Sequence, residues 1–355
     1  MFKENYNVIG VMSGTSLDGI DLAHIHFNIK DNRWSFDLLE CATISYSNNW
    51  LNKLKTAINF SQQELLQLNV DYTLYIGAII NDFVAKNNIE NLDAVCSHGH
   101  TILHQPENRF TLQIGNLPQI ASTINQTVVC DFRVQDVLLG GQGAPLVPIG
   151  DKILFAEYDF CLNLGGFSNV SFNDNGNRIA FDISPVNTVL NFYANKLGLD
   201  YDDKGKIAKY GNINQELLQD LNDLDYYKNS YPKSLGYEFV QQIVLPIIEN
   251  HYLEIDDKMA TFVEHIAQQI AIVLQSGTGK LFITGGGAYN DFLIERIKFL
   301  LPTLEIVIPT SKIIEYKEAL IFGLLGVLKL RNEVNVLKSV TGASVDHSSG
   351  NIFFK

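Results

Sequence analysis

The stretch VMSGTSLDGIDLA, residues 11–23, places a loop of small, hydroxyl-bearing and acidic residues between two short apolar runs. The runs YNVIGVM (6–12) and IDLAHIHFNI (20–29) are rich in Val and Ile and alternate in part, which predicts two strands. An ordinary hairpin needs roughly two to five loop residues. The longer loop between these two strands therefore indicates a binding role.

The composition of this loop suits a phosphate. Glycines let backbone N–H groups approach an anion, hydroxyls add further donors, and carboxylates beside such donors favour a cation. We therefore expect a phosphate carried with Mg²⁺; a surface turn rich in Ser and Gly is the structural alternative. The residues assigned to this phosphate loop are Gly14, Thr15, Ser16, Leu17, Asp18, Gly19, Ile20 and Asp21.

The bulk properties bound the class of protein. With 355 residues the chain is long for one core, so two domains are expected. The net charge of −13 argues against partners such as nucleic acid or an anionic membrane surface. We expect a cytoplasmic protein, because the sequence has no N-terminal signal segment, no membrane span, and four widely spaced cysteines that form no zinc or disulfide pattern.

The order of elements repeats along the chain. Strand, small polar turn, strand, strand and helix follow one another from residue 6 and again from residue 159. The Gly/Pro-rich run 137–151 separates the repeats, so we expect an N-terminal lobe of residues 1–136 and a C-terminal lobe of residues 137–355, whose last segment can return to the first lobe.

Two more glycine turns follow apolar strands, in NLGGFSN (163–169) and TGGGAYN (284–290). A strand that ends in glycines lets a ligand lie against bare backbone. The first of these turns is expected to hold phosphate and the second a base and ribose; close helix–strand packing is the alternative for the second. The residues assigned to the nucleotide here are Gly165, Gly166, Asn169, Gly285, Gly286, Gly287 and Asn290.

Polar side chains are expected where strands of the first half finish, in SHGHTILHQP (97–106), LQIGN (112–116) and CDFRVQD (130–136). Hydrogen-bonding groups and one cation suit an anionic small molecule such as a sugar acid. The residues assigned to the substrate are His98, Thr101, Gln113, Asn116 and Arg133, with His100 beside them. The alternative is a metal-dependent hydrolase that uses His98, His100 and His104, but no Asp or Glu follows at ligand spacing, so no metal site is predicted.

Asp182 is the candidate catalytic residue. It lies in RIAFDISP (178–185), at the end of a predicted strand and just before Ser184 and Pro185, which predict the start of a helix. An ionised carboxylate there can act as a general base. A helix-capping aspartate is the structural alternative.

Taken together, these motifs resemble the anhydro-N-acetylmuramic acid kinase family over nearly the whole chain. The similarity rests on GVMSGTSLDGID (10–21), SHGHT (97–101), LQIGN (112–116), DFRVQDVLLGGQGAPLVP (131–148), LNLGGFSN (162–169), FD with PVN (181–187), YDDKGKIAKYG (201–211), PKSLGYEF (232–239), ITGGGAYN (283–290), KEALIFGLL (317–325) and SVTGA (339–343).

The resemblance implies an α/β, two-lobed actin-like and sugar-kinase ATPase fold, made of two RNase H-like domains with an interdomain cleft. It also implies a cytoplasmic homodimer that opens 1,6-anhydro-N-acetylmuramic acid and phosphorylates O6 with ATP, with Asp182 as the base. The chain departs from the family pattern at His100, at DISPVN (182–187) and at Tyr237, where the family commonly has Gln, DTGPGN and Arg. A sensor of cell-wall fragments without catalysis is a further alternative.

Overall fold

The computed structural model describes residues 2–14 and 17–355, and the chain divides into two compact units. Unit 1 runs as far as Leu154 and resumes at Tyr316, whereas unit 2 is Phe155–Glu315. The C-terminal segment thus packs with the N-terminal residues in unit 1. The two substrate-binding lobes expected at residues 1–136 and 137–355 remain a prediction.

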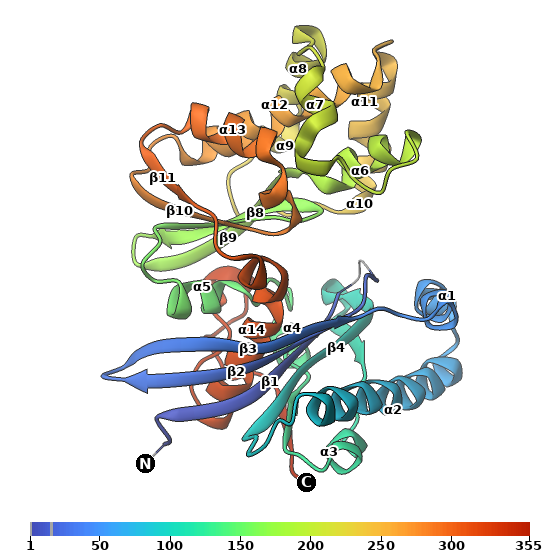
Figure 1. Ribbon diagram of the computed structural model, residues 1–355, viewed down its shortest axis with the longest axis vertical. Helices are drawn as coiled ribbons and strands as arrows, with labels where there is room; N and C mark the ends of the chain where they lie inside the picture. Colours follow the sequence, from blue (N-terminus) through green and yellow to red (C-terminus); the bar gives the residue numbers. More distant parts are fainter. Residues whose placement is uncertain (1, 15–16) are drawn as a thin grey trace. The chain divides into compact units, whose positions relative to one another are not determined.

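Unit 1 is built on a seven-stranded mixed sheet with the strand order β12-β6-β4-β1-β2-β3, and β5 pairs with β4 outside that path (Figure 1). The first three strands form an antiparallel meander, while β4 lies parallel to β1 and β6 parallel to β4. The strands are β1 (Asn5–Ser13), β2 (Ile20–Lys30), β3 (Arg33–Ile44), β4 (Ala94–Gln105), β5 (Phe110–Ile114), β6 (Val128–Cys130) and β12 (Asn351–Phe353).

Helices cover both faces of this sheet because its strands are apolar on both sides. Tyr72 and Ile76 of α2 pack with Ile9 and Val11 in one core cluster. On the opposite face α14 lies so close that a Cβ on Gly10 would meet the Ala319 carbonyl oxygen at 1.9 Å. The helices of unit 1 are α1 (Asn48–Thr56), α2 (Gln62–Lys86), α3 (Gln119–Ile124), α4 (Val134–Leu138), α5 (Pro148–Leu154), α15 (Lys338–Thr341) and, from Tyr316 on, α14 (Ser311–Leu330).

Unit 2 repeats the same plan. Its five-stranded sheet has the order β11-β10-β7-β8-β9, again with an antiparallel meander of three strands followed by two parallel strands. The repeat expected from the order of elements is therefore present in the pairing of the strands. They are β7 (Phe160–Leu164), β8 (Phe167–Asp174), β9 (Asn177–Pro185), β10 (Gly279–Thr284) and β11 (Leu304–Val307).

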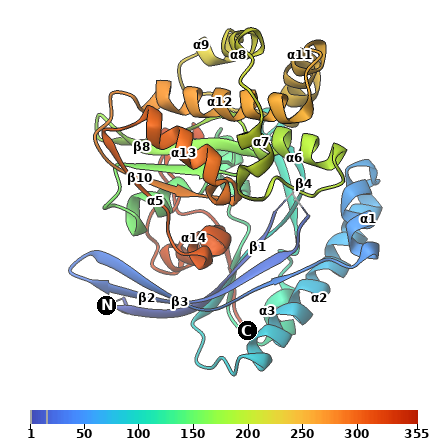
Figure 2. The ribbon, with the colours of Figure 1, turned by 45° about the horizontal axis from the view of Figure 1, so that its top comes forward.

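The longest helix of unit 2, α12, lies along α13 over the strands (Figure 2). The apolar face of residues 259–274 is buried in this core, with Met259, Phe262 and Ile266 inaccessible to solvent. The helices are α6 (Asn187–Lys196), α7 (Lys206–Tyr210), α8 (Gln215–Asn222), α9 (Asp225–Lys228), α10 (Tyr237–Phe239), α11 (Leu245–Asn250), α12 (Ile255–Leu274) and α13 (Asp291–Leu300), with a π-helical stretch at Val240–Val244 and 3₁₀ turns η3 (Asp203–Gly205) and η5 (Gly286–Tyr289).

Two expectations about element boundaries were wrong. Strand β4 continues to Gln105, so His98, His100 and Thr101 lie inside it and not at its end. The strand accommodates this with an irregularity at Gly99, whose φ of +74° and shifted register let β4 pass from β1 to β5. Strand β9 likewise continues to Pro185, and α6 begins only at Asn187. Asp182 is therefore a strand residue and caps no helix.

Candidate active site

The phosphate loop joins β1 to β2, as predicted, and its described residues are Gly14 and 17–21. The Leu17 N–H donates to the Gly14 carbonyl oxygen at 3.3 Å, and Leu17 has a left-handed φ of +63°. Asp18 is exposed, and Asp21, the second residue of β2, has its carboxylate accepting from Thr43 Oγ1 at 2.6 Å. Ile20 is fully buried and anchors the start of β2. Thr15 and Ser16, which were assigned to the same loop, lie outside the described residues.

A buried hydrogen-bond network holds the residue before this loop. Ser13 Oγ lies 2.6 Å from Tyr46 Oη, 3.0 Å from Tyr72 Oη and 2.8 Å from His100 Nδ1, while the two tyrosine hydroxyls lie 2.7 Å apart. The three hydroxyl–hydroxyl contacts use all three hydroxyl protons, so the His100 Nδ1–H donates to Ser13 and Nε2 is an acceptor. Burial lowers the pKa of His100 to about 4, which keeps the ring neutral.

The predicted substrate residues of unit 1 lie close together. Arg133 Nε donates to His98 Nε2 at 2.8 Å, and Asn116 Nδ2 donates to the His98 carbonyl oxygen at 3.1 Å. Gln113 on β5 pairs in register with Thr101 on β4, and Gln113 Nε2 lies 3.3 Å from Thr101 Oγ1. The sequence thus identified a cluster that the sheet assembles from three separate segments.

This cluster has unused hydrogen-bonding capacity. Gln113 Oε1 and Asn116 Oδ1 are buried acceptors without a partner among residues 2–14 and 17–355. Because a buried polar atom left unpaired costs free energy, these oxygens favour a ligand with N–H or O–H donors. Burial lowers the pKa of Arg133 to about 10, which still leaves the guanidinium charged at neutral pH.

The three histidines of the alternative metal site have separate partners. His98 Nδ1 contacts the Gly99 carbonyl oxygen, His100 Nδ1 contacts Ser13, and His104 Nδ1 lies 3.0 Å from Thr111 Oγ1. Since His98 Nε2 also accepts from Arg133, both of its nitrogens are engaged. The arrangement is that of individually hydrogen-bonded rings, and it does not favour a metal-dependent hydrolase.

In unit 2, Asp182 belongs to a row of polar residues that crosses four strands. Register pairs connect Thr284 on β10 with Asn163 on β7, Asn163 with Asn169 on β8, and Asn169 with Asp182 on β9. Directly opposed residues share one face of a sheet, so the row presents amide, hydroxyl and carboxylate groups on a single face. Asn163 and Thr284 were not assigned to the site from the sequence. Thr284 directly precedes Gly285, and Asn163 lies two residues before Gly165.

The segment Tyr226–Leu235 holds Asp182 in place. Tyr226 Oη donates to the Asp182 carbonyl oxygen at 2.7 Å, and the Asp182 N–H donates to the Lys233 carbonyl oxygen at 3.2 Å. The Leu235 N–H donates to Asp182 Oδ2 at 2.9 Å. Burial raises the pKa of Asp182, and the Leu235 hydrogen bond opposes that rise. The carboxylate is thereby oriented through one oxygen, while Oδ1 has no hydrogen-bond partner in the described part of the chain.

The glycine turn between β7 and β8 is joined to the start of α6. The Gly166 carbonyl oxygen accepts from the Val186 N–H at 2.8 Å and from Thr188 Oγ1 at 2.9 Å, and the Gly165 carbonyl oxygen accepts from the Asn187 N–H at 3.3 Å. The carbonyl groups of the turn are therefore directed at the helix.

The glycines of the turn Gly285–Gly287 have two different roles: the outer two pack on β7, and the middle one lines a cavity. A Cβ on Gly285 would lie 2.5 Å from Asn163 Oδ1, and a Cβ on Gly287 would lie 2.7 Å from Leu164 Cβ, so these two glycines allow close packing on β7. A Cβ on Gly286 would meet only Asn187 Nδ2, at 3.6 Å. The packing alternative therefore holds for the outer two glycines and not for Gly286.

Gly286 lines a cavity of about 650 Å³ within unit 2. Asn290 also lines it, and its Oδ1 accepts from the Leu293 N–H at 3.0 Å as the N-cap of α13. The fold brings together the remaining walls from four segments: Asn187, Leu190 and Asn191 of α6, residues 201–204, the group Ala288, Tyr289 and Asp291, and Ile308.

One further carboxylate was missed by the sequence-based assignment. Glu318, on α14 within the motif KEALIFGLL, lies within electrostatic reach of Arg133 and Asp21, so it belongs to the same region of unit 1. The sequence indicated Glu318 only through its place in the motif KEALIFGLL (317–325).

Each of the two α/β units has an antiparallel meander of three strands followed by parallel strands, with a glycine turn between its first two strands, and this plan defines a class of two-unit α/β proteins. The family model for anhydro-N-acetylmuramic acid kinase matches residues 6–355. The chain belongs to the anhydro-N-acetylmuramic acid kinase family. It is thus an ATP-using kinase that makes N-acetylmuramic acid 6-phosphate in cell-wall recycling.

The named relatives align with nearly the whole chain. The chain is 32% identical to the anhydro-N-acetylmuramic acid kinase of Bacillus cereus, with 98% of each chain covered. It is 34% identical to that of Francisella tularensis subsp. novicida, again with 98% of each covered. Among solved structures, the activator of the 2-hydroxyisocaproyl-CoA dehydratase from Clostridium difficile with bound ADPNP is 14% identical, with 92% of this chain and 96% of that chain covered and a TM-score of 0.42.

Proposed function

We propose that Asp182 is the general base of this kinase. The observation that carries the proposal is its geometry: Oδ2 is fixed by the Leu235 N–H at 2.9 Å, and the half-buried carboxylate has a raised pKa. A pKa raised towards neutrality makes a carboxylate a stronger base while it remains ionised. Oδ1 is then the atom that accepts a proton from water.

The reaction balances around this proton. Water adds to C1 of the anhydro sugar and gives its proton to Asp182, while the bond between C1 and O6 breaks. O6 takes the γ-phosphoryl group of ATP, and the products are N-acetylmuramic acid 6-phosphate, ADP and the proton held on Asp182. Positioning and electrostatic stabilisation do most of the work in such a phosphoryl transfer.

We assign the ATP phosphates to the loop from Gly14 to Asp21 and to the turn formed by Gly165, Gly166 and Asn169. Backbone N–H groups of glycine turns are suitable donors to phosphate oxygens. Asp18 and Asp21 would hold Mg²⁺, because carboxylate oxygens are its preferred ligands. When bound, the ion would offset the charge of the phosphates.

We assign the nucleoside to the cavity lined by Gly286 and Asn290, since about 650 Å³ is a suitable volume for a base with its ribose. Gly285 and Gly287 contribute to this site indirectly, through their packing on β7.

We assign the sugar to His98, Thr101, Gln113, Asn116 and Arg133. The unpaired amide oxygens of Gln113 and Asn116 suit its hydroxyl and amide donors, and the guanidinium of Arg133 suits its lactyl carboxylate. In these assignments the side chains of unit 1 bind the sugar, and none of them forms or breaks a covalent bond.

Two coarser expectations accompany the proposal. We propose a homodimer, as family membership implies, which light scattering with mass determination would test. We also propose a cytoplasmic location, where ATP is available; within residues 2–14 and 17–355 there is no helix with the length and apolar character needed to cross a membrane.

The test compares Asp182→Asn with Asp174→Asn, a control on the adjacent strand whose carboxylate accepts from Tyr231 Oη. We expect Asp182→Asn to lose about 10²–10⁴-fold in turnover and to keep ATP binding, while Asp174→Asn remains active. With the wild type in ¹⁸O-water, the label should appear at C1 and the phosphate at O6. Wild-type turnover by Asp182→Asn would overturn the assignment of the base.

A further inference from the structure

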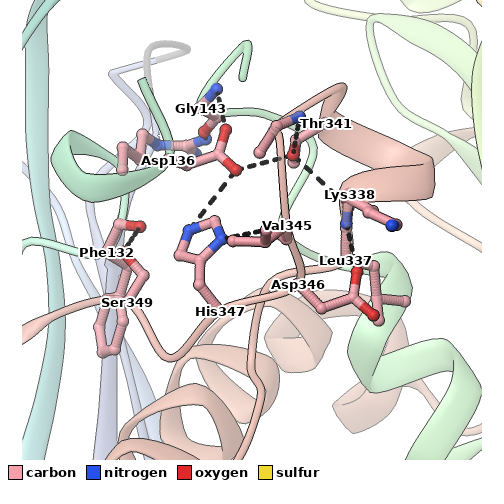
Figure 3. Close-up of polar contacts among 12 residues, drawn as sticks. Phe132, Asp136, Gly143, Leu337, Lys338, Thr341, Val345, Asp346, His347 and Ser349 are labelled. Carbon is pink, nitrogen blue, oxygen red and sulfur yellow. Dashed lines mark hydrogen bonds and ion pairs between the residues drawn. The ribbon is translucent and has the colours of Figure 1, made fainter. Parts of the chain in front are cut away.

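The buried carboxylate of Asp136 connects Thr341, in the C-terminal segment of unit 1, to Gly143 (Figure 3). Asp136, on α4, is fully buried; Thr341 Oγ1 donates to its Oδ1 and the Gly143 N–H donates to its Oδ2, each at 2.7 Å. The Gln142 N–H also donates to the Thr341 carbonyl oxygen at 2.8 Å. His347 Nε2 lies 3.6 Å from Asp136 Oδ1, and its Nδ1 contacts the Val345 carbonyl oxygen.

Gly143 is held from two sides by residues of one short helical turn. Its N–H is bound by Asp136, and its carbonyl oxygen accepts from Arg133 Nη1 at 2.6 Å. Its φ of +68° favours glycine, and a Cβ there would lie 2.8 Å from Val137 Cγ2. Because both neighbouring peptide groups are fixed, the position of the Gly143 carbonyl depends on the Asp136 carboxylate.

The second anchor of Arg133 is His98. A carbonyl oxygen only accepts, so the contact between His98 Nδ1 and the Gly99 carbonyl places the proton on Nδ1, and Nε2 accepts from Arg133 Nε. A guanidinium has five N–H groups. Two are used, by His98 and Gly143, and the others have no protein hydrogen-bond partner in the described ranges. Arg133 is therefore oriented by two contacts and keeps donors for a carboxylate.

We infer that Thr341 and Asp136 are positioning residues for Arg133: the Thr341 hydroxyl fixes the Asp136 carboxylate, which fixes Gly143, whose carbonyl aims the guanidinium at the carboxylate of the sugar. This inference rests on the proposed role of Arg133. It gives the C-terminal segment, more than 200 residues away in sequence, a part in recognition of the anionic substrate. A bidentate guanidinium–carboxylate contact needs such fixed geometry.

The experiment replaces Thr341 by Val, which keeps the shape and removes the donor. We expect the KM for the anhydro sugar to rise about tenfold or more, with the KM for ATP unchanged. Thr341→Ser should restore the wild-type value, and Asp136→Asn is the second variant should Thr341→Val fold poorly. Ser349→Ala is the matched control, since Ser349 is buried in the same segment but donates to the Phe132 carbonyl oxygen.

Arg133→Ala tests the proposed role of Arg133 separately from the positioning role of Thr341 and Asp136. If Arg133→Ala leaves the KM for the sugar unchanged, the proposed role of Arg133 is wrong. If Arg133→Ala raises that KM but both Thr341→Val and Asp136→Asn leave it unchanged, the positioning inference is wrong. Thr341→Val should have no further effect in the Arg133→Ala background, nor on an anhydro sugar that lacks the lactyl carboxyl. An equal rise in the KM for sugar and for ATP would indicate a merely structural role and would overturn the inference.

Discussion

The Leu235 N–H donates to Asp182 Oδ2 at 2.9 Å, so a backbone group of one segment orients the carboxylate of another. Burial raises the pKa of Asp182 above 3.8 despite this hydrogen bond. The base must be ionised to accept a proton, so kcat should fall as the pH decreases through that raised pKa. A pH–rate profile measures this. Asp174→Asn should keep the same acid limb, and a profile without any acid limb above pH 3.8 would contradict the role of Asp182.

A second prediction concerns stability in acid. The pKa of His100 is lowered from 6.5 to about 4 because the ring is buried. Between those values the unfolded chain binds a proton that the folded chain does not, so this contribution to stability is complete above pH 6.5 and decreases as the pH falls to about 4. The loss amounts to about 3 kcal/mol at most.

His100→Gln should remove this part of the pH dependence. The amide can still contact Ser13, so we expect a folded protein whose free energy of unfolding falls less steeply between pH 6.5 and 4 than that of the wild type. Urea titrations at several pH values measure it. Identical slopes in His100→Gln and wild type would refute the prediction.

A third prediction separates two neighbouring glycines. Gly285 has a φ of +82° and no room for a Cβ, so Gly285→Ala should destabilise the fold, by about 1–3 kcal/mol. Gly286→Ala has room but places a methyl group in the cavity, so it should leave the melting temperature nearly unchanged and raise the KM for ATP about tenfold. Thermal unfolding and steady-state kinetics on both variants provide the measurement. Equal effects of the two substitutions on stability would contradict the division of roles.

A fourth prediction tests whether Asn290 acts beyond its cap. Asn290→Ala removes the acceptor for the Leu293 N–H and should cost about 1 kcal/mol. Asn290→Ser retains a capping oxygen on a shorter side chain, so it should keep most of the stability. If Asn290 also contacts the nucleoside, the Ser variant should still show a raised KM for ATP. A Ser variant with wild-type kinetics would limit Asn290 to capping.

Much of the local structure could be predicted because it depends on short-range chemistry. Ser61 and Glu64 have the residue types and the spacing of a capping box, and they form one at the start of α2, with Glu64 Oε2 accepting from the Ser61 N–H at 2.7 Å. The hairpin around the phosphate loop was predicted from periodicity, and α12 has its apolar residues at helical spacing. The end of β4 was not, because pairing with β5 extends the strand past polar residues that would otherwise favour a turn.

The kinase family, the two-unit α/β plan and the residue types needed for phosphate, sugar and base can be read from the amino-acid sequence, since they depend on glycine turns, hydroxyls and carboxylates at fixed local spacing. Which side chains meet depends on the tertiary structure. Asn169 is opposite Asp182 because of strand register, and Thr341 reaches Asp136 because the chain returns to unit 1. Register and chain return depend on how the cores pack, and packing couples residues at any separation along the chain.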